Sequence, residues 1–596
     1  MKIRMKKFVS LAALLFVCAV TASCKQGVQS DAKAQIEDWP SFGRDLAGQR
    51  FSPATQINTE NINNLAEAWR FKSGISASFQ TTPIVQNGVM YLSLPFNHVI
   101  ALNAKTGEEL WRYKHDRRKD WKMCCGPANR GVAVSGGKVF MGTVDARLIA
   151  LDAKTGSKLW DIDVVESAVT TEGQGSLNTS DPNSVRKTTG GTGVGMAMAP
   201  VVYKGKVIIG ITGVGYGLHI DNPREDAPLG AVIGVTGRYG RPGFLAAYDV
   251  NTGKRIWQFD TIPHKGWEGG FVETTDDGVK LNRDVAAEKA ALTHYPDAAR
   301  FGGGSAWSTP AIDAASDTLF FGTGNPSPQM NDISRPGDNL YTVSLVALNA
   351  NTGKLKWHYQ QVPHDLWGYD LASPPVLFNY QLNGKAVAAV GEAGKTGWFY
   401  IHDRSTGKLL KKSDAFVPQK NMFAKATFDG VVVYPGILGG SNWSPISVDE
   451  ANQRVFVSGI HAPIKYTLHE APAKDGKPSI RYASSEPTDD PHWGTLSAID
   501  LISGKIVWQN KTLQPLVGGT LATAGGLLFM GEGDGHFNAY NSQTGELLWQ
   551  TKSEFGVNAP PITYTVDGKQ YIAVASGGNS IFGYKQGDAV LVYALP

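Results

Sequence analysis

The sequence predicts an all-β fold, an eight-bladed β-propeller, and three observations support this prediction. First, 68 glycines, 31 prolines and 15 tryptophans among 596 residues indicate many tight turns between strands rich in aromatic residues. Second, one hairpin motif recurs along the chain. Third, its copies are spaced by about 40 to 50 residues, or about twice that distance where a copy has decayed, which is the period of a four-stranded blade. Dividing the length by this period, with allowance for insertions, gives about eight blades.

The repeated motif has the pattern of two strands joined by a tight turn. It consists of an apolar pair, Asp or Asn, two residues, Thr or Ser followed by Gly, three residues and Trp. The polar residues and the Gly favour a hairpin turn, and the Trp opens the second strand. We expect these tryptophans to pack between blades and to take no part in chemistry. The copies span residues 101–111, 150–160, 247–257, 347–357, 498–508 and 539–549, and a copy at 401–411 lacks the Trp.

The N-terminus has the pattern of an export signal. Four basic residues among the first seven precede an uncharged run from Phe8 to Ala22. This run is too short to span a bilayer comfortably, and small residues follow it. Two processing routes stay open: cleavage after Ala22, or lipidation of Cys24, which would anchor the protein to a membrane. We expect an export signal at residues 1–24, a flexible linker at 25–37 and the propeller at 38–596, in a protein that leaves the cytosol.

The composition limits the classes of partner. The chain is 42% hydrophobic and 18% charged, with a formal net charge of +4 that is not gathered in any block. A mild basic excess spread in this way gives no case for nucleic-acid binding. No later apolar run is long enough to span a membrane.

Two of the four cysteines, Cys124 and Cys125, are adjacent. Neighbouring Cα atoms lie about 3.8 Å apart, which is closer than the ~4.4–6.8 Å usual for a disulfide. A bond between them would strain the intervening peptide, and such strain tends to occur at functional sites. An oxidising compartment permits the bond. The alternative, two small buried apolar side chains, stays open at this point.

Several stretches resemble the pyrroloquinoline-quinone (PQQ)-dependent alcohol dehydrogenases. They are "DWPSFGRDLAGQRFSPATQINTENINNLAEAW" (38–69), "CCGPANRG" (124–131), "FGTGNPSP" (321–328) and "PHDLWGYDLASPPVL" (363–377). The resemblance runs from about Asp38 to the C-terminus. It implies an eight-bladed quinoprotein of the periplasm that oxidises an alcohol with PQQ.

The resemblance also implies a cofactor site. Cys124 and Cys125 would form a disulfide against one face of the quinone, and Trp307 would stack on the other face, where burial and ring stacking favour a flat ligand. The planar guanidinium of Arg130 suits the carboxylates of the cofactor. Lys395 would contact the quinone oxygens and favour the reduced, more anionic form. Further contacts fall on Gln80, Thr212, Gly213, Val214 and Asn442.

The sequence departs from the family at the metal and base positions. Asn325, one metal ligand of the family, is present, but Gly215 stands at the position of a Glu ligand and Gly368 at that of the catalytic Asp. Gln80 replaces a third acidic residue. A hard cation such as Ca²⁺ or a lanthanide requires several anionic oxygens, so the loss of these acids leaves the predicted pocket more positive than in its relatives.

Two repairs of the metal site are open. Asp370 follows Gly368 by two residues, so in a strand the two side chains would point to the same face, and Asp370 would then act as metal ligand and base beside Asn325. Alternatively, a loop at residues 216–242, which resembles an insertion, would supply Asp221, Glu225 or Asp226. His364 is another candidate base near the site, although its place in the "VPHDLW" turn favours a structural role.

The substrate pocket and the electron acceptor are also indicated. Val517 stands where relatives often have Trp, and a smaller wall at the pocket mouth predicts a bulky secondary alcohol, a polyol or an alcohol-bearing ring. The 596 residues contain no Cys-x-x-Cys-His, so we expect no covalent haem on this chain and a separate acceptor such as cytochrome c.

Two other functions stay open. One is a propeller of the same descent that hydrolyses or oxidises a small anion, and the missing acids favour it. The other is a non-catalytic lipoprotein scaffold, which would not require the adjacent cysteines, Trp307, Arg130 or Lys395.

Overall fold

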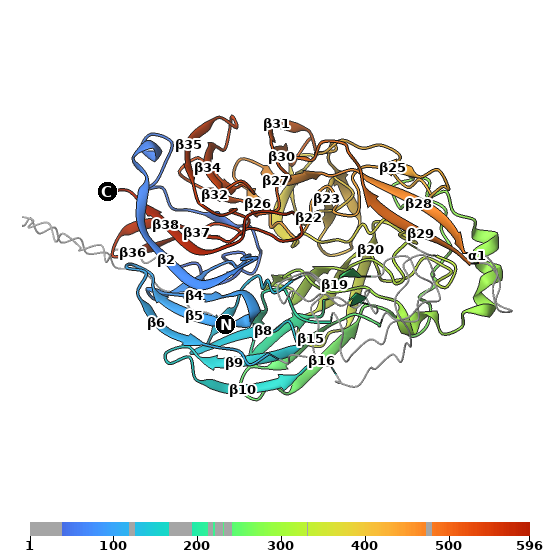
Figure 1. Ribbon diagram of the computed structural model, residues 1–596, viewed down its shortest axis with the longest axis horizontal. Coiled ribbons are helices and arrows are strands. Elements are labelled where there is room, and N and C mark those ends of the chain that lie inside the picture. The colour runs from blue at the N-terminus through green and yellow to red at the C-terminus, as the bar shows by residue number, and fades with distance from the viewer. Residues whose placement is uncertain are drawn as a thin grey trace, which may run out of the picture. The chain divides into compact units, whose positions relative to one another are not determined.

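A computed structural model of the protein describes residues 38–117, 126–165, 194–212, 219–220, 230–231, 241–330, 332–471 and 480–596. These residues belong to one compact unit, Ile36–Pro596. Within it, seven four-stranded sheets and one sheet extended to five strands follow one another in chain order (Figure 1). The prediction of an all-β, eight-bladed propeller is confirmed.

The strands of the eight blades are antiparallel within each blade, apart from the added β1. In order of the blades, they are β3 (Ile84–Gln86), β4 (Val89–Ser93), β5 (Val99–Asn103) and β6 (Glu109–Tyr113); β7 (Ala133–Ser135), β8 (Lys138–Gly142), β9 (Arg147–Asp152) and β10 (Lys158–Asp163); β11 (Val201–Tyr203), β12 (Lys206–Gly210), β15 (Phe244–Asp249) and β16 (Arg255–Asp260); β17 (Ala311–Asp313), β18 (Thr318–Gly322), β19 (Ser344–Asn349) and β20 (Leu355–Gln360); β21 (Val376–Leu382), β22 (Lys385–Ala393), β23 (Phe399–Asp403) and β24 (Leu409–Lys412); β26 (Ser447–Asp449), β27 (Arg454–His461), β30 (Trp493–Asp500) and β31 (Ile506–Thr512); β1 (Phe51–Ser52), β32 (Leu521–Thr523), β33 (Leu527–Gly531), β34 (His536–Asn541) and β35 (Leu547–Lys552); and β36 (Ile562–Val566), β37 (Lys569–Ser576), β38 (Gly587–Ala594) and β2 (Ala66–Ala77).

The remaining elements lie outside the eight blades. A three-stranded sheet contains β25 (Val431–Val433), β28 (Ile464–Ala471) and β29 (Ile480–Pro487), and a short pair contains β13 (His219–Ile220) and β14 (Gly230–Ala231). The helices of the described residues are α1 (Val285–Ala291), η1 (Ile62–Asn64), η2 (Pro95–Asn97), η3 (Leu292–His294) and η4 (Ala298–Phe301). Among the described residues, none of the helices has the length and apolar character needed to cross a membrane.

The tryptophans of the repeat join neighbouring blades, as predicted. The Trp111 indole of one blade donates a hydrogen bond of 3.0 Å to the Ala153 carbonyl of the next. A Cβ at Gly156, in the turn of that next blade, would lie 2.5 Å from the Trp111 ring, so only Gly fits beneath the indole. Bonds of 3.1 to 3.3 Å repeat this pattern for Trp69, Trp160, Trp257, Trp357, Trp508 and Trp549.

The copy that lacks Trp follows the same geometry with a different residue. Lys411 stands at the Trp position of that blade, and its side chain lies 3.2 Å from the position of a Cβ at Gly504 in the next blade. The aliphatic part of a lysine therefore takes the place of the indole at this single junction.

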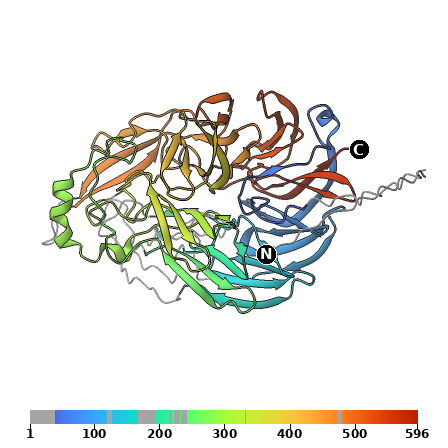
Figure 2. The ribbon, with the colours of Figure 1, turned by 180° about the vertical axis from the view of Figure 1, so that it is seen from behind.

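The N-terminal part of the propeller closes the ring. β2 pairs with β38 near the C-terminus, and both views show the first blade beside the last (Figures 1 and 2). β2 also carries Trp69, which packs on Gly107 of the first blade. Trp69 was not recognised as part of the repeat because no Thr-Gly turn precedes it.

Candidate active site

The candidate site residues lie in loops at one end of the propeller axis. Arg130, Trp307 and Asp370 precede the first strands of their blades, β7, β17 and β21, whereas Asn325 and Lys395 follow second strands, β18 and β22. In an antiparallel pair, the start of one strand and the end of its neighbour lie at the same edge. The topology therefore gathers these five side chains at a common end.

Two indoles and a guanidinium form the first part of the site. The Arg130 guanidinium carbon lies 5.0 Å from the centre of the Trp307 ring and 5.0 Å from that of Trp443, within the range of cation–π attraction. Arg130 Nη1 also donates to the Trp307 carbonyl at 3.2 Å. These three side chains are buried. Broad aromatic faces next to a fixed cation suit a flat, anionic ligand.

A carboxylate and an ammonium form the second part. Lys395 Nζ lies 3.1 Å from Asp370 Oδ2 and donates to the Gly368 carbonyl at 3.0 Å. Asp370 Oδ1 accepts the Asn325 backbone N–H at 2.5 Å. Asp370 and Lys395 are each 7% exposed. The predicted base therefore lies beside the predicted cation, held by charge-assisted hydrogen bonds on both oxygens.

One loop, residues 435–443, borders both parts. Its Gly440 N–H donates to the Lys395 carbonyl at 2.7 Å, and Trp443 follows three residues later in the same loop. A Cβ at Gly439 would lie 2.3 Å from the Lys395 side chain, and Gly439 has a φ of +86°. Glycine is required there because the backbone passes directly over the lysine stem.

Three other residues of the predicted cofactor site are described: Asn442, Thr212 and Gln80. Both ends of the Asn442 carboxamide are used within its own loop, by the Leu438 carbonyl and the Trp443 N–H. The Thr212 hydroxyl accepts the Ala197 N–H at 3.3 Å. Gln80 follows the end of β2 in the chain, and its side chain is buried.

Several predicted positions lie outside the described residues. They are Cys24, Cys124, Cys125, Gly213, Val214, Gly215, Asp221, Glu225 and Asp226. The disulfide, the lipidation site and the loop ligands therefore stay predictions.

The structure assigns His364 a structural place and corrects the prediction for Val517. His364 Nδ1 lies 2.6 Å from the Gly337 carbonyl oxygen and Nε2 lies 3.4 Å from Asp332 Oδ2, in a buried setting.

Val517 does not line an open mouth of the substrate pocket. It is fully buried in one cluster with Trp307 and Trp443, because Tyr584 from the last blade packs in the same cluster.

Three residues of this region were not predicted from the sequence. Trp443 follows Asn442 and gave no separate signal. Gln329 is a buried glutamine beside Gly368. Glu392 lies in the buried part of β22, where burial raises the pKa of its carboxyl to about 8 and the Gln361 amide donates to it at 2.8 Å.

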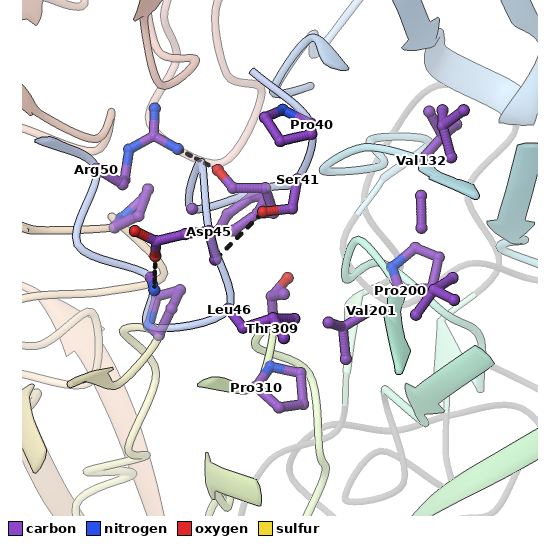
Figure 3. A pocket seen from close by; sticks show the side chains of 18 of the residues that line it. Pro40, Ser41, Asp45, Leu46, Arg50, Val132, Pro200, Val201, Thr309 and Pro310 are labelled. Atoms are coloured by element: carbon purple, nitrogen blue, oxygen red, sulfur yellow. Dashed lines mark hydrogen bonds between the residues drawn. The ribbon is translucent and has the colours of Figure 1, made fainter. Parts of the chain in front are cut away.

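A separate cavity of about 220 Å³ lies along the strands just beyond these loops. Its lining includes Val132, Thr309 and the N-terminal segment Pro40–Arg50 (Figure 3). Arg50 is fully buried there and donates to the carbonyls of Phe42, Thr520 and Pro561. This arginine ties the N-terminal segment to the last two blades, which accounts for its burial without a catalytic role.

The described residues fit PQQ better than they fit a metal. The indoles, Arg130 and Lys395 match a flat tricarboxylate. In contrast, no group of three or more His, Cys, Asp or Glu side chains that could hold a metal occurs among the described residues. Asp370 already accepts hydrogen bonds from Lys395 and the Asn325 backbone, so these residues alone do not make a calcium site.

An eight-bladed propeller whose axial loops gather indoles, two cations and a carboxylate has the architecture of a quinoprotein dehydrogenase. The family model "PQQ: Glucose/ethanol/alcohol dehydrogenase, beta-propeller domain" matches residues 39–421 and 410–572. The chain therefore belongs to the PQQ-dependent alcohol dehydrogenase family, and it is an oxidoreductase acting on CH–OH donors.

Individual relatives agree with this assignment. The quinohemoprotein alcohol dehydrogenase of Comamonas testosteroni is 35% identical over 92% of this chain and 74% of the relative. The quinoprotein alcohol dehydrogenase PedH of Pseudomonas putida is 31% identical over 90% of this chain and 85% of its own. The crystal structure of the Comamonas enzyme superposes with a TM-score of 0.75, covering 95% of this chain and 81% of that one at 31% identity. A europium-containing methanol dehydrogenase gives a TM-score of 0.73 at 27% identity, over 94% of this chain and 98% of that one.

Proposed function

We propose that this protein oxidises a bulky secondary alcohol or polyol, with Asp370 as the base and PQQ held by Trp307, Arg130 and Lys395. The observation that carries the proposal is the pairing of Asp370 with Lys395 at 3.1 Å, two residues before Ala372, which packs with the two indoles. PQQ, when bound, supplies the acceptor for the two electrons that leave the carbinol carbon.

The base has the hydrogen-bonding capacity for this role. Each carboxylate oxygen of Asp370 accepts one bond, so each keeps a lone pair that can take the hydroxyl proton of the substrate. A positioned base contributes about 10²- to 10⁴-fold to the rate. Lys395 donates two of its three N–H bonds to Gly368 and Asp370, which leaves the third for a quinone oxygen.

A metal in this site would use Asn325 and Asp370. The europium-containing relative supports a lanthanide as one candidate, and Ca²⁺ is the other. The remaining ligands would have to come from the stretch that includes Gly215 or from the loop with Asp221, Glu225 and Asp226. Binding a cation there would also require Lys395 to release Asp370, because ammonium and metal compete for the same oxygens.

The cell compartment and the electron acceptor are proposed from the sequence. The export signal supports a periplasmic location, with Cys24 as the site of a lipid anchor if the second processing route is used. Cys124 and Cys125 would form a disulfide against the quinone face opposite Trp307, with Gln80, Thr212, Gly213, Val214 and Asn442 around its edge. Electrons would pass to a separate acceptor such as cytochrome c.

A second candidate is an activity on a small anion. Arg130 and Lys395 are both buried, and glycines stand at positions 215 and 368, where the family has acids, so an anionic ligand is favoured. The third candidate, a non-catalytic scaffold, gives no reason for a buried ion pair beside two indoles.

Reconstitution with PQQ tests the proposal. The absorption spectrum of the purified protein would be recorded with PQQ alone, with added Ca²⁺ and with an added lanthanide, followed by an assay with alcohols and an artificial electron acceptor. Bleaching of the quinone band by an alcohol supports the dehydrogenase. Tight PQQ binding without reduction by any alcohol, or no PQQ binding, contradicts it and favours the anion site or the scaffold, respectively.

A further inference from the structure

Gln329 is a buried glutamine whose side chain has no hydrogen-bond partner among the described residues. It follows Asn325 by four residues in the loop after β18 and is 3% exposed. Its Oε1 atom is fully buried and accepts no bond. The backbone is fixed, because Arg335 donates to the carbonyls of Pro328 and Gln329 at 2.7 and 3.0 Å. Burying an amide without a partner costs about 1–3 kcal/mol, so this side chain is arranged for a partner outside the chain.

The Gln329 carboxamide fills the space that a side chain at position 368 would occupy. A Cβ at Gly368 would lie 1.9 Å from Gln329 Nε2 and 3.0 Å from the Ile437 side chain. The Gly368 carbonyl accepts a bond from Lys395, whose ammonium also pairs with Asp370. The amide is therefore next to the proposed reacting end of the site, and Ile437 beside it is only partly buried.

Other roles for this amide agree less well with its surroundings. Gln570, a buried glutamine in the last blade, is in contrast bonded at both ends, by the Ile57 N–H and the Thr563 hydroxyl at 2.9 and 3.0 Å. A role as metal ligand has no support among the described residues, where no group of three or more His, Cys, Asp or Glu side chains could hold a metal. A neutral polar group of the substrate meets neither objection.

We propose that Gln329 binds a second oxygen of the substrate, next to the carbinol that is oxidised. The substrate class would then be vicinal diols, polyols and hydroxy-carbonyl compounds. A primary amide offers both N–H donors and a carbonyl acceptor, so it can bind a hydroxyl group in either direction. This inference rests on the proposed alcohol dehydrogenase function and specifies its substrate.

The test compares a vicinal diol with the monoalcohol of the same carbon chain. The wild-type protein, loaded with PQQ, should show the higher kcat/KM for the diol. Gln329→Met keeps the length of the side chain and removes the amide, so kcat/KM for the diol should fall on the order of 10- to 100-fold. The value for the monoalcohol and the affinity for PQQ, measured by tryptophan fluorescence quenching, should not change.

A matched control and a second variant separate specificity from folding. Gln570→Met removes a buried amide that is distant from Gln329 in the sequence. It should lower the Tm while leaving the ratio of the kcat/KM values for the diol and the monoalcohol unchanged. Gly368→Ala adds the methyl group that displaces the Gln329 amide, so it should reduce the diol preference without altering Gln329 itself.

The outcomes distinguish the inference from the function on which it rests. An unchanged diol-to-monoalcohol ratio in both Gln329→Met and Gly368→Ala overturns the role of Gln329 alone. Absence of oxidation of either alcohol by the wild-type protein overturns the dehydrogenase proposal together with it. If Gln329→Met does not fold, the ratio of kcat/KM for the diol to kcat/KM for the monoalcohol in Gly368→Ala tests the role of Gln329 instead.

Discussion

Replacing Asp370 by Asn tests the proposed chemistry most directly. The amide is nearly the same size as the carboxylate and can still accept the Asn325 N–H, but it cannot take a proton. We expect kcat to fall by about 10²- to 10⁴-fold, the contribution of a positioned base. Binding of PQQ should persist, because Trp307 and Arg130 are untouched.

The ion pair with Lys395 sets the expected effect on stability. The side chains of Asp370 and Lys395 are only 11% and 8% exposed, and removing one partner of a buried pair costs about 3–5 kcal/mol. This figure is an upper bound for Asn, which keeps a carbonyl oxygen near the ammonium. Adding Lys395→Met to Asp370→Asn removes the unpaired charge, so the double variant should recover stability without recovering turnover.

The assay uses the PQQ-reconstituted protein with an artificial electron acceptor, and urea unfolding gives the stability of each variant. A kcat for Asp370→Asn within a few fold of wild type would refute the role of Asp370 as base. A parallel sample dialysed against EDTA, with metal removal verified by elemental analysis, tests the metal. Loss of turnover that Ca²⁺ or a lanthanide restores supports Asp370 as a ligand, and undiminished turnover contradicts that role but leaves the base unaffected.

Three further predictions concern the cysteines, the tryptophans and a buried acid. Thiol titration of the denatured, unreduced protein should find neither Cys124 nor Cys125 free, and two reactive thiols from these positions would disprove the disulfide. Trp307→Ala should abolish tight PQQ binding with the fold retained. Trp257→Ala, which removes a buried interblade indole, should cost about 3–5 kcal/mol of stability. Equal losses of PQQ affinity in the two variants would contradict the assignment of Trp307 to the cofactor site and of Trp257 to the packing between blades. Burial raises the pKa of Glu392 to about 8, so the unfolded chain ionises first and stability should fall as the pH rises from about 4.5 to about 8. Glu392→Gln should remove this fall, and parallel Tm profiles of the two proteins between about pH 5 and pH 9 would show that Glu392 does not cause it.

The repeat could be predicted from the sequence because each blade repeats one local pattern. Trp111 and its counterparts occupy equivalent places in that pattern, and their packing on the turn glycines follows from it. Trp69 could not be found in this way, because it lies in the strand that closes the ring and has no hairpin of its own. Its partner strand, β38, lies about 500 residues away along the chain.

The site could be predicted only in part, for a similar reason. Asp370 and Lys395 were recognised separately, but their pairing depends on loops from two strand ends that meet in space. Gln329 gave no signal at all, since a glutamine in a loop is usually solvated. Its position became informative only through the backbone of Gly368, with a φ of +79°. The prediction for Val517 was wrong because Tyr584, a residue of the last blade, packs in the same cluster.

The closure of the ring by β2 has a consequence for the order in which the chain folds. β2 is synthesised early, whereas its pairing partner β38 is synthesised last, so the edge of β2 stays unpaired while the intervening blades are made. An unpaired strand edge is prone to intermolecular pairing. The blades that carry Arg130, Trp307, Asp370 and Lys395 lie between these two strands, so they emerge while the ring is still open. Folding of these blades and closure of the ring are therefore separable events, and a chain truncated before β38 would expose the unpaired edge of β2.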